Sequence, residues 1–178
     1  GEDVILGQSA GVYAAPQVIG DRVWLSLPTH RGMRAVCTDI ESMDVVFSYE
    51  LEGLAQVIPA PQGPWVALQG LGPTAANGLR CLSSEEGRLI DICSSTVHSV
   101  DWLPDGNRLV VSTERVEGAG LEWVLIDLEN NSQRTLCLFW PTPDELMRLR
   151  FSSQFGRSHP RLNRDGSRLC FASFGDPG

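Results

Sequence analysis

A strand–turn–strand unit recurs along the chain, and this repetition limits the possible folds more than any single motif does. Segment 98–114, HSVDWLPDGNRLVVSTE, predicts a strand, a Pro-Asp-Gly turn and a second strand. Segment 158–174, SHPRLNRDGSRLCFASF, predicts the same with Asp165-Gly166 in place of Asp105-Gly106. Asp-Gly suits a tight turn because Gly adopts positive φ without strain and Asp accepts hydrogen bonds from nearby backbone N–H groups. Aligning the two glycines superimposes the apolar positions of the second strands.

Two more divergent copies precede these units. Segments 15–28 and 55–70 again predict strand, turn and strand, and each is followed by a further strand, a polar turn and a strand. On this alignment Val23, Trp65, Leu109 and Leu169 are equivalent, at spacings of 42, 44 and 60 residues. Such spacings fit the four-stranded blade of a β-propeller.

The repeats therefore predict an all-β chain, a β-propeller-like array of three to four four-stranded antiparallel blades with one short helical insertion. We expect a single propeller-like domain over residues 1–178. Its predicted parts are units 16–53, 54–96 and 97–139, a partial unit 158–174, an N-terminal segment 1–15 and an insertion 140–157.

The helix is predicted in the insertion. Thr142 and Glu145 have the spacing of a capping box, and Pro143 stands at the first helical position. Leu146, Met147 and Leu149 would supply a short apolar face, so we expect one to three turns of helix.

The last unit stops after two strands, and three arrangements are open. Residues 1–15 could complete the last blade and close a small ring. Alternatively the array is open and covered by a partner, or the chain is a fragment of a longer propeller. Exposed blade edges promote aggregation, so each arrangement requires that something covers them.

Composition excludes several classes of function. A formal charge of −8 argues against nucleic-acid binding, which depends on basic side chains. The chain has no apolar run of 18 residues, so we predict no transmembrane segment. Its five cysteines show no CxxC pair and no Cys/His ligand spacing, and we read them as small buried hydrophobic residues rather than as a zinc site. An odd count fits no complete disulfide framework, and a single bridge stays open.

The segments VDWLPDGNRLVVSTE and HPRLNRDGSRLCFASF resemble the repeat of TolB-type propellers, which are similar to WD-repeat propellers. The resemblance departs at Arg164, where the family usually has Pro. It implies a propeller fold, and functions that range from protein docking to sugar binding to a regulatory domain beside a peptidase. By analogy with the family it also suggests an extracytoplasmic, periplasmic location in a bacterium.

Catalytic signals are weak. Gly7 to Gly11 reads GQSAG, similar to the G-x-S-x-G of α/β-hydrolases, but no helix can follow before Pro16, so Ser9 is not expected to be a nucleophile. His98 and His159 begin the first strands of consecutive units. A metal shared between them and Asp101 is the weaker interpretation, and we predict no catalytic residue, no metal and no cofactor.

Partner binding is expected on one face of the array. The turns at 85–87, 105–106, 130–131 and 165–166 share one face, and the longer loops share the other. Long loops on a rigid scaffold commonly carry binding residues, and Arg pairs well with acidic groups. The predicted partner-binding residues are Trp140, His30, Arg31, Arg115, Arg148, Arg150 and Arg157.

These observations favour a non-enzymatic binding or scaffolding module that docks another protein subunit as part of a larger complex. The alternative is a carbohydrate-active enzyme similar to oligogalacturonate lyases, with a site at the channel mouth near His159. A purely structural subunit is a third possibility.

Overall fold

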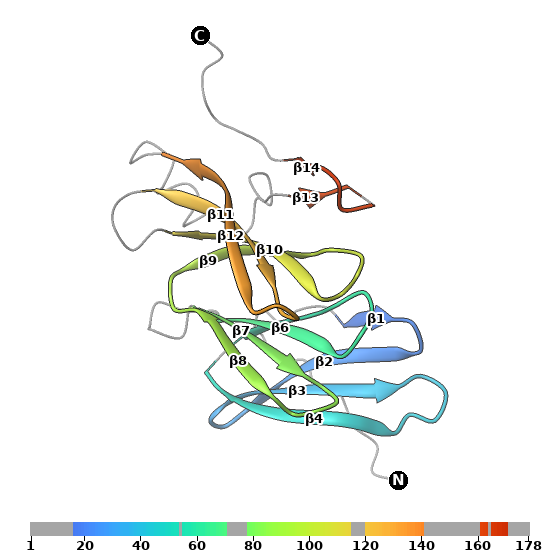
Figure 1. Cartoon of the computed structure of the whole chain (residues 1–178). Helices are drawn as coiled ribbons and strands as arrows, with labels where there is room; N and C mark the ends of the chain where they lie inside the picture. Colours follow the sequence, from blue (N-terminus) through green and yellow to red (C-terminus); the bar gives the residue numbers. More distant parts are fainter. Residues whose placement is uncertain are drawn as a thin grey trace.

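The fold was analysed in a computed structural model that describes residues 16–53, 55–70, 78–114, 120–140, 161–163 and 165–170. Three four-stranded antiparallel sheets follow one another in sequence order, and a two-stranded hairpin comes after them (Figure 1). The first sheet contains β1 (Gln17–Ile19), β2 (Arg22–Thr29), β3 (Gly32–Asp39) and β4 (Val45–Glu52). The second contains β5 (Ala55–Pro59), β6 (Trp65–Gly70), β7 (Leu79–Ser83) and β8 (Leu89–Cys93). The third contains β9 (Val97–Trp102), β10 (Arg108–Glu114), β11 (Leu121–Asp127) and β12 (Ser132–Phe139), and the hairpin joins β13 (Arg161–Leu162) to β14 (Leu169–Cys170).

This architecture confirms the all-β fold class with four-stranded antiparallel sheets. No helix occurs in the described residues. The helix predicted in the insertion lies outside them, because residues 141–157 are not described, and so does the N-terminal segment 1–15. Nor does the described part contain a helical segment with the length and hydropathy needed to cross a bilayer.

The sheets pack face to face through three apolar layers. Between the first and second sheets, Trp24, Ala35 and Cys37 meet Val66 and Leu68. The next layer lies between the second and third sheets, and the last joins the third sheet to the hairpin. In Figure 1 the β1–β4 sheet and the hairpin therefore stand at opposite ends of the row.

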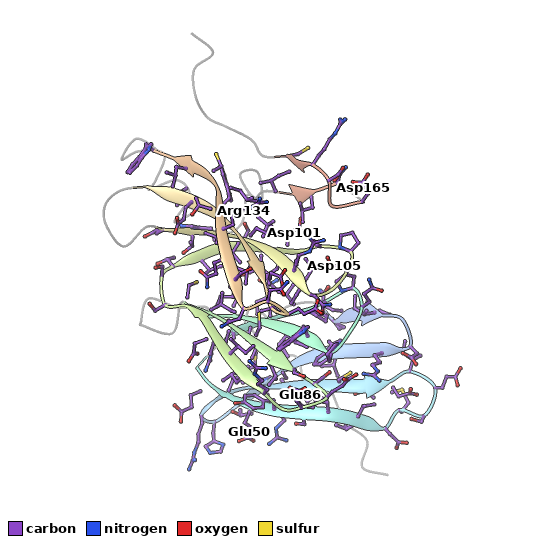
Figure 2. All side chains as sticks on the ribbon, viewed as in Figure 1. Glu50, Glu86, Asp101, Asp105, Arg134 and Asp165 are labelled. Atoms are coloured by element: carbon purple, nitrogen blue, oxygen red, sulfur yellow. The ribbon has the colours of Figure 1, made fainter. Side chains whose placement is uncertain are left out.

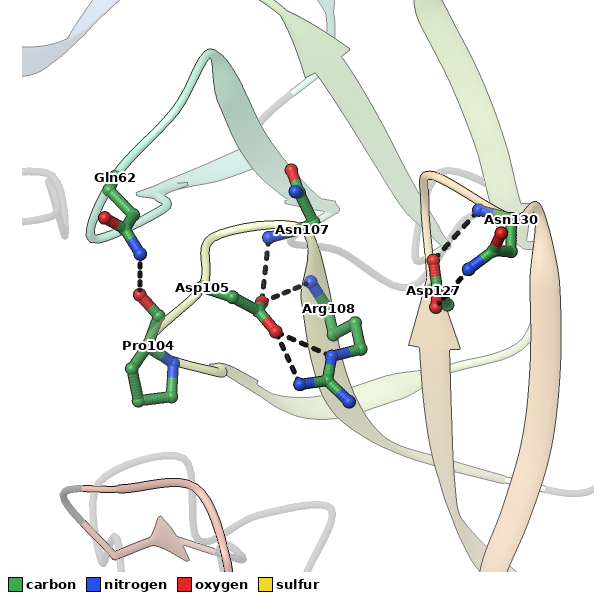
Figure 3. A network of polar contacts seen from close by, with 7 residues as sticks. All are labelled: Gln62, Pro104, Asp105, Asn107, Arg108, Asp127 and Asn130. Carbon is green, nitrogen blue, oxygen red and sulfur yellow. Dashed lines mark hydrogen bonds and ion pairs between the residues drawn. The ribbon is translucent and has the colours of Figure 1, made fainter.

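The turn between β9 and β10 and the turn between β13 and β14 are held by the same pattern of backbone hydrogen bonds. Leu103 N–H donates to Arg108 O at 2.8 Å and Gly106 N–H to Leu103 O at 3.0 Å; Asn163 and Gly166 make the same two bonds at 2.9 Å. Gly106 and Gly166 both have φ of +71°, which confirms the alignment of their glycines. In Figure 3, Asp105 accepts backbone N–H groups of Asn107 and Arg108 and pairs with the Arg108 guanidinium.

In the second sheet the predicted repeat alignment, which placed Trp65 at the position of Leu109, is wrong by one residue. Ala60 N–H donates to Trp65 O, as Leu103 does to Arg108 O, so Trp65 is equivalent to Arg108 and not to Leu109. A one-residue shift in a strand moves each side chain to the opposite face. Val66 therefore occupies the place of Leu109, and Gly63, with φ of +77°, occupies the place of Gly106.

Acidic pH should lower the stability of the fold by protonating two aspartates in its turns, Asp105 and Asp127. Burial tends to raise the pKa of Asp105, but hydrogen bonds from Arg108 and Asn107 hold it below its usual value, and backbone and side-chain hydrogen bonds from Asn130 lower the pKa of Asp127. A carboxyl whose pKa is lower in the folded than in the unfolded chain stabilises the fold at pH values above its unfolded pKa. This stabilisation is lost as the pH falls through its folded pKa. We expect the urea-derived free energy of unfolding to fall below about pH 4.

The matched variant is Asp105→Asn, which keeps the side-chain shape and cannot be ionised. It should be less stable than the wild type at neutral pH, and the difference should shrink as the wild-type carboxylate becomes protonated. A constant difference from neutral pH to about pH 2 would show that the charge of Asp105 contributes nothing.

Candidate binding surfaces

The outward face of the first sheet carries a row of apolar side chains on β2 and single apolar side chains on β1 and β4. Register places Val18 beside Val23 and Leu25 beside Val36 on the face opposite the packed Trp24. Val23, Leu25 and Leu27 are half-buried, whereas Val18 is 63% exposed, and Val45 on the edge strand β4 is 61% exposed. Apolar patches of this kind mark interaction sites when their side chains are contiguous. We call this surface, defined by Val18, Val23, Leu25, Leu27 and Val45, the end face.

Repeat equivalence identifies what such a face does elsewhere in the molecule. Val23, Val66 and Leu109 occupy the same position in their sheets, because the preceding residue pairs in the same way across the turn. Val66 is buried against the first sheet and Leu109 against the second. The end face is therefore the sheet-packing surface of its repeat.

A groove of about 350 Å³ opens between the first and second sheets at their turn ends. Its walls come from the β1–β2 turn on one side and the β5–β6 turn on the other, and its lining includes Trp24, Pro59, Gln62, Trp65 and Ser84. Arg22, Asp21 and Glu85 also line it. This volume lies in the range of small-ligand sites, and the lining combines aromatic and polar groups.

We call the face of the array that carries the longer loops the loop face. The residues predicted to bind a partner there are only partly within the described part of the chain. His30 and Arg31 are exposed in the β2–β3 turn, and Trp140, just after β12, is 61% exposed and borders Gly120. The alternating direction of the antiparallel strands places the β2–β3 turn and the end of β12 on the same side of the array. Arg115, Arg148, Arg150 and Arg157 lie outside the described residues, so partner binding by this set stays a prediction.

Of the residues considered for a shared metal, His98 and Asp101 are described, and both lie in other interactions. Asp101 Oδ2 accepts a hydrogen bond from the backbone N–H of Leu162 at 2.7 Å and so joins the hairpin to the third sheet. Figure 2 labels Asp101 next to Asp105. His98 Nε2 lies 3.3 Å from Glu114 Oε1. Across the described residues no group of three or more His, Cys, Asp or Glu side chains could hold a metal. His159 and Ser9 lie outside that part of the chain.

The cysteines differ in their surroundings. All five are free thiols; Cys37 and Cys81 are fully buried in sheet cores, as expected, and burial raises the pKa of Cys81 to about 12. Cys93 and Cys137 are half-buried, and Cys170 is exposed, which corrects the expectation for that residue. The high pKa keeps Cys81 protonated and unreactive.

Comparisons with known proteins identify the architecture. No family model matches the chain, and no curated protein matches its sequence. Solved structures do match its fold. The β-propeller domain of the Trilobed protease from Pyrococcus furiosus aligns at TM-score 0.55 and 14% identity, over 74% of this chain and 43% of that one. The chain has a β-propeller repeat fold.

Two further structures support this fold. An oligogalacturonate lyase in complex with manganese aligns at TM-score 0.57 and 16% identity, over 85% of this chain and 47% of the lyase. TolB from Acinetobacter baumannii aligns at 0.55 and 13% identity, over 89% and 36%. The chain thus spans less than half the length of these propeller-containing proteins. At such identities the likeness shows the fold alone.

Sequence reasoning missed both the end face and the groove. The signal for the groove was present, because Pro61 and Gly63 have the spacing of Pro104 and Gly106. Aligning on that pair would have placed Trp65 correctly and shown that the first turn, Gly20-Asp21, is shorter than the others.

Proposed function

We propose that the chain is a non-enzymatic β-propeller module for protein–protein interaction and complex assembly, and that the end face receives a β-sheet of its protein partner. The supporting observation is the repeat equivalence of this face. Positions that correspond to Val23 are buried against a neighbouring sheet in the second and third repeats. The first repeat presents the same apolar surface outward.

The physical basis is burial of apolar area. Val18 and Val45 are largely exposed, and half-buried Val23 and Thr38 lie between them in one cross-strand row. Half-buried Leu25 and Leu27 follow Val23 on the same face of β2. Covering such side chains contributes roughly 25 cal/mol for each Å² removed from water. A stable interface needs about 1,000 Å² in total, which a sheet laid on the end face could supply together with its rim. The Arg34–Glu50 ion pair lies on the same face and would form a polar border.

The proposal also includes the role of a scaffold or complex subunit. Assignment to the TolB-like or WD-repeat-like group is supported by the sequence resemblance and by the likeness in fold to TolB. An extracytoplasmic location is supported by the family analogy alone.

The test begins with a photo-crosslinking residue, p-benzoyl-phenylalanine, placed at position 18 of the full chain in its native host. Position 86 provides the matched control, since Glu86 is exposed in the β7–β8 turn of the second sheet, whereas the end face belongs to the first sheet. We expect a protein to be crosslinked from position 18 and not from position 86. That protein is then purified and its affinity for the unmodified chain is measured.

Leu25→Asp decides whether the contact is specific. Leu25 is half-buried, so the variant should remain folded while it places a charge in the centre of the end face. We expect at least a hundredfold weaker binding of the purified partner, with circular dichroism unchanged. Equal affinity for Leu25→Asp and wild type, or equal crosslinking from both positions, would contradict the proposal.

A further inference from the structure

The second and third sheets show how the groove position is filled when it is closed. Trp102, at the end of β9, extends to the second sheet and donates its indole N–H to Ile58 O at 2.9 Å. Gln62 donates its side-chain amide to Pro104 O at 2.5 Å (Figure 3). The backbone of Gln62 also lies directly against Gly106. An aromatic ring and a carboxamide thus close this interface.

Between the first and second sheets two of the corresponding groups are smaller, whereas Trp24 is larger than its counterpart Ala67. Pro59 pairs with Val66 as Trp102 pairs with Leu109, so a proline stands where the indole would be. Ser84 donates its backbone N–H to Pro64 O as Leu128 does to Asn107 O, so a serine stands in the place of a leucine.

The first turn is also short. Ile19 pairs directly with Arg22, which leaves only Gly20 and Asp21 to form the turn, whereas Pro61 to Pro64 form the turn of the second sheet. No residue of the first turn reaches Gly63 as Gln62 reaches Gly106, and a Cβ at Gly63 would meet nothing within 4 Å. Three local differences therefore produce the groove.

We propose that this groove binds an aromatic side chain next to a carboxamide, presented by a peptide segment of a partner protein. The aromatic ring would lie against Trp24 and the β5–β6 turn, and the amide would donate to the carbonyl of Pro61, which is equivalent to that of Pro104. The rim carries Asp21 and Glu85 against Arg22, which favours a neutral or cationic ligand. The site is separate from the end face, so its failure would leave the proposed function unaffected.

The probe is N-acetyl-L-tryptophanamide, which is neutral and supplies both an indole and a carboxamide. It is titrated into the full chain while backbone amides are followed by two-dimensional NMR. We expect saturable shifts centred on Gly20, Asp21, Gln62 and Gly63, with a millimolar dissociation constant, and no saturable shifts with N-acetyl-L-alaninamide.

Pro59→Trp restores the residue found in the next repeat and should fill the groove, so it is expected to weaken probe binding at least tenfold and to raise the melting temperature. Ser84→Leu restores Leu128 without changing a proline and provides a second filled groove if Pro59→Trp folds poorly. Glu86→Ala, outside the groove lining, should bind the probe as the wild type does. Absence of saturable shifts, shifts located elsewhere, or undiminished binding by Ser84→Leu would overturn the proposal.

Discussion

Replacing Trp102 by Ala is expected to lower the free energy of unfolding by about 3–5 kcal/mol. Trp102 is buried between the second and third sheets, and its indole N–H donates to Ile58 O at 2.9 Å. The substitution removes the ring from this layer and leaves the carbonyl without its donor. Urea unfolding followed by circular dichroism measures the loss without depending on tryptophan fluorescence.

Trp140→Ala is the matched control, because Trp140 is 61% exposed and lies outside the three apolar layers. Its free energy of unfolding should change by less than about 0.5 kcal/mol. Trp102→Phe should fall between the two, since it keeps an aromatic ring and loses the N–H donor. Equal stability of the two alanine variants would show that the second and third sheets do not pack as described.

Replacing Gly106 by Ala should be far more damaging than the same change at Gly63. The two residues occupy equivalent turn positions with φ of +71° and +77°, so both substitutions carry the same backbone strain. A Cβ at Gly106 would overlap the carbonyl oxygen of Gln62, whereas one at Gly63 meets open space. Overpacking of this kind typically costs about 1–3 kcal/mol, which should appear as the difference between the two variants.

Thermal unfolding of both variants in the same buffer measures this difference. Gly166→Ala should be intermediate, because its Cβ would lie 3.0 Å from the Pro104 ring, which can shift slightly. If Gly63→Ala is as destabilised as Gly106→Ala, the turns of the second and third sheets are not in contact and the stacking of repeats is wrong.

The sequence predicted the repeat and its antiparallel sheets because turn chemistry is local. Asp105-Gly106 and Asp165-Gly166 specify their own hydrogen bonds whatever packs around them, and the structure shows the same bonds in both turns. Trp65 was misplaced for the complementary reason. An apolar residue next to a turn fits either of two registers, and only the hydrogen bond from Ala60 distinguishes them.

The binding surfaces could not be predicted in the same way, because they depend on which sheet lies against which. Pro59 and Ser84 are unremarkable until they are compared with Trp102 and Leu128 in the adjacent interface. Val18 likewise looks like an ordinary strand residue, and its 63% exposure becomes informative only once the equivalent positions are found buried. The arginines predicted to bind a partner lie outside the described residues, and their role stays a prediction.

Hydroxyl-radical footprinting of the chain with the partner isolated through position 18 shows on which face the partner docks. The method reports side-chain protection and compares the two predicted partner surfaces in one sample. We predict protection of Val18, Leu25 and Leu27 on the end face, and protection of His30 and Trp140 in addition would support the loop face as a second contact with the partner. Protection confined to His30 and Trp140, with the end face still labelled, would show that the partner does not dock on the end face.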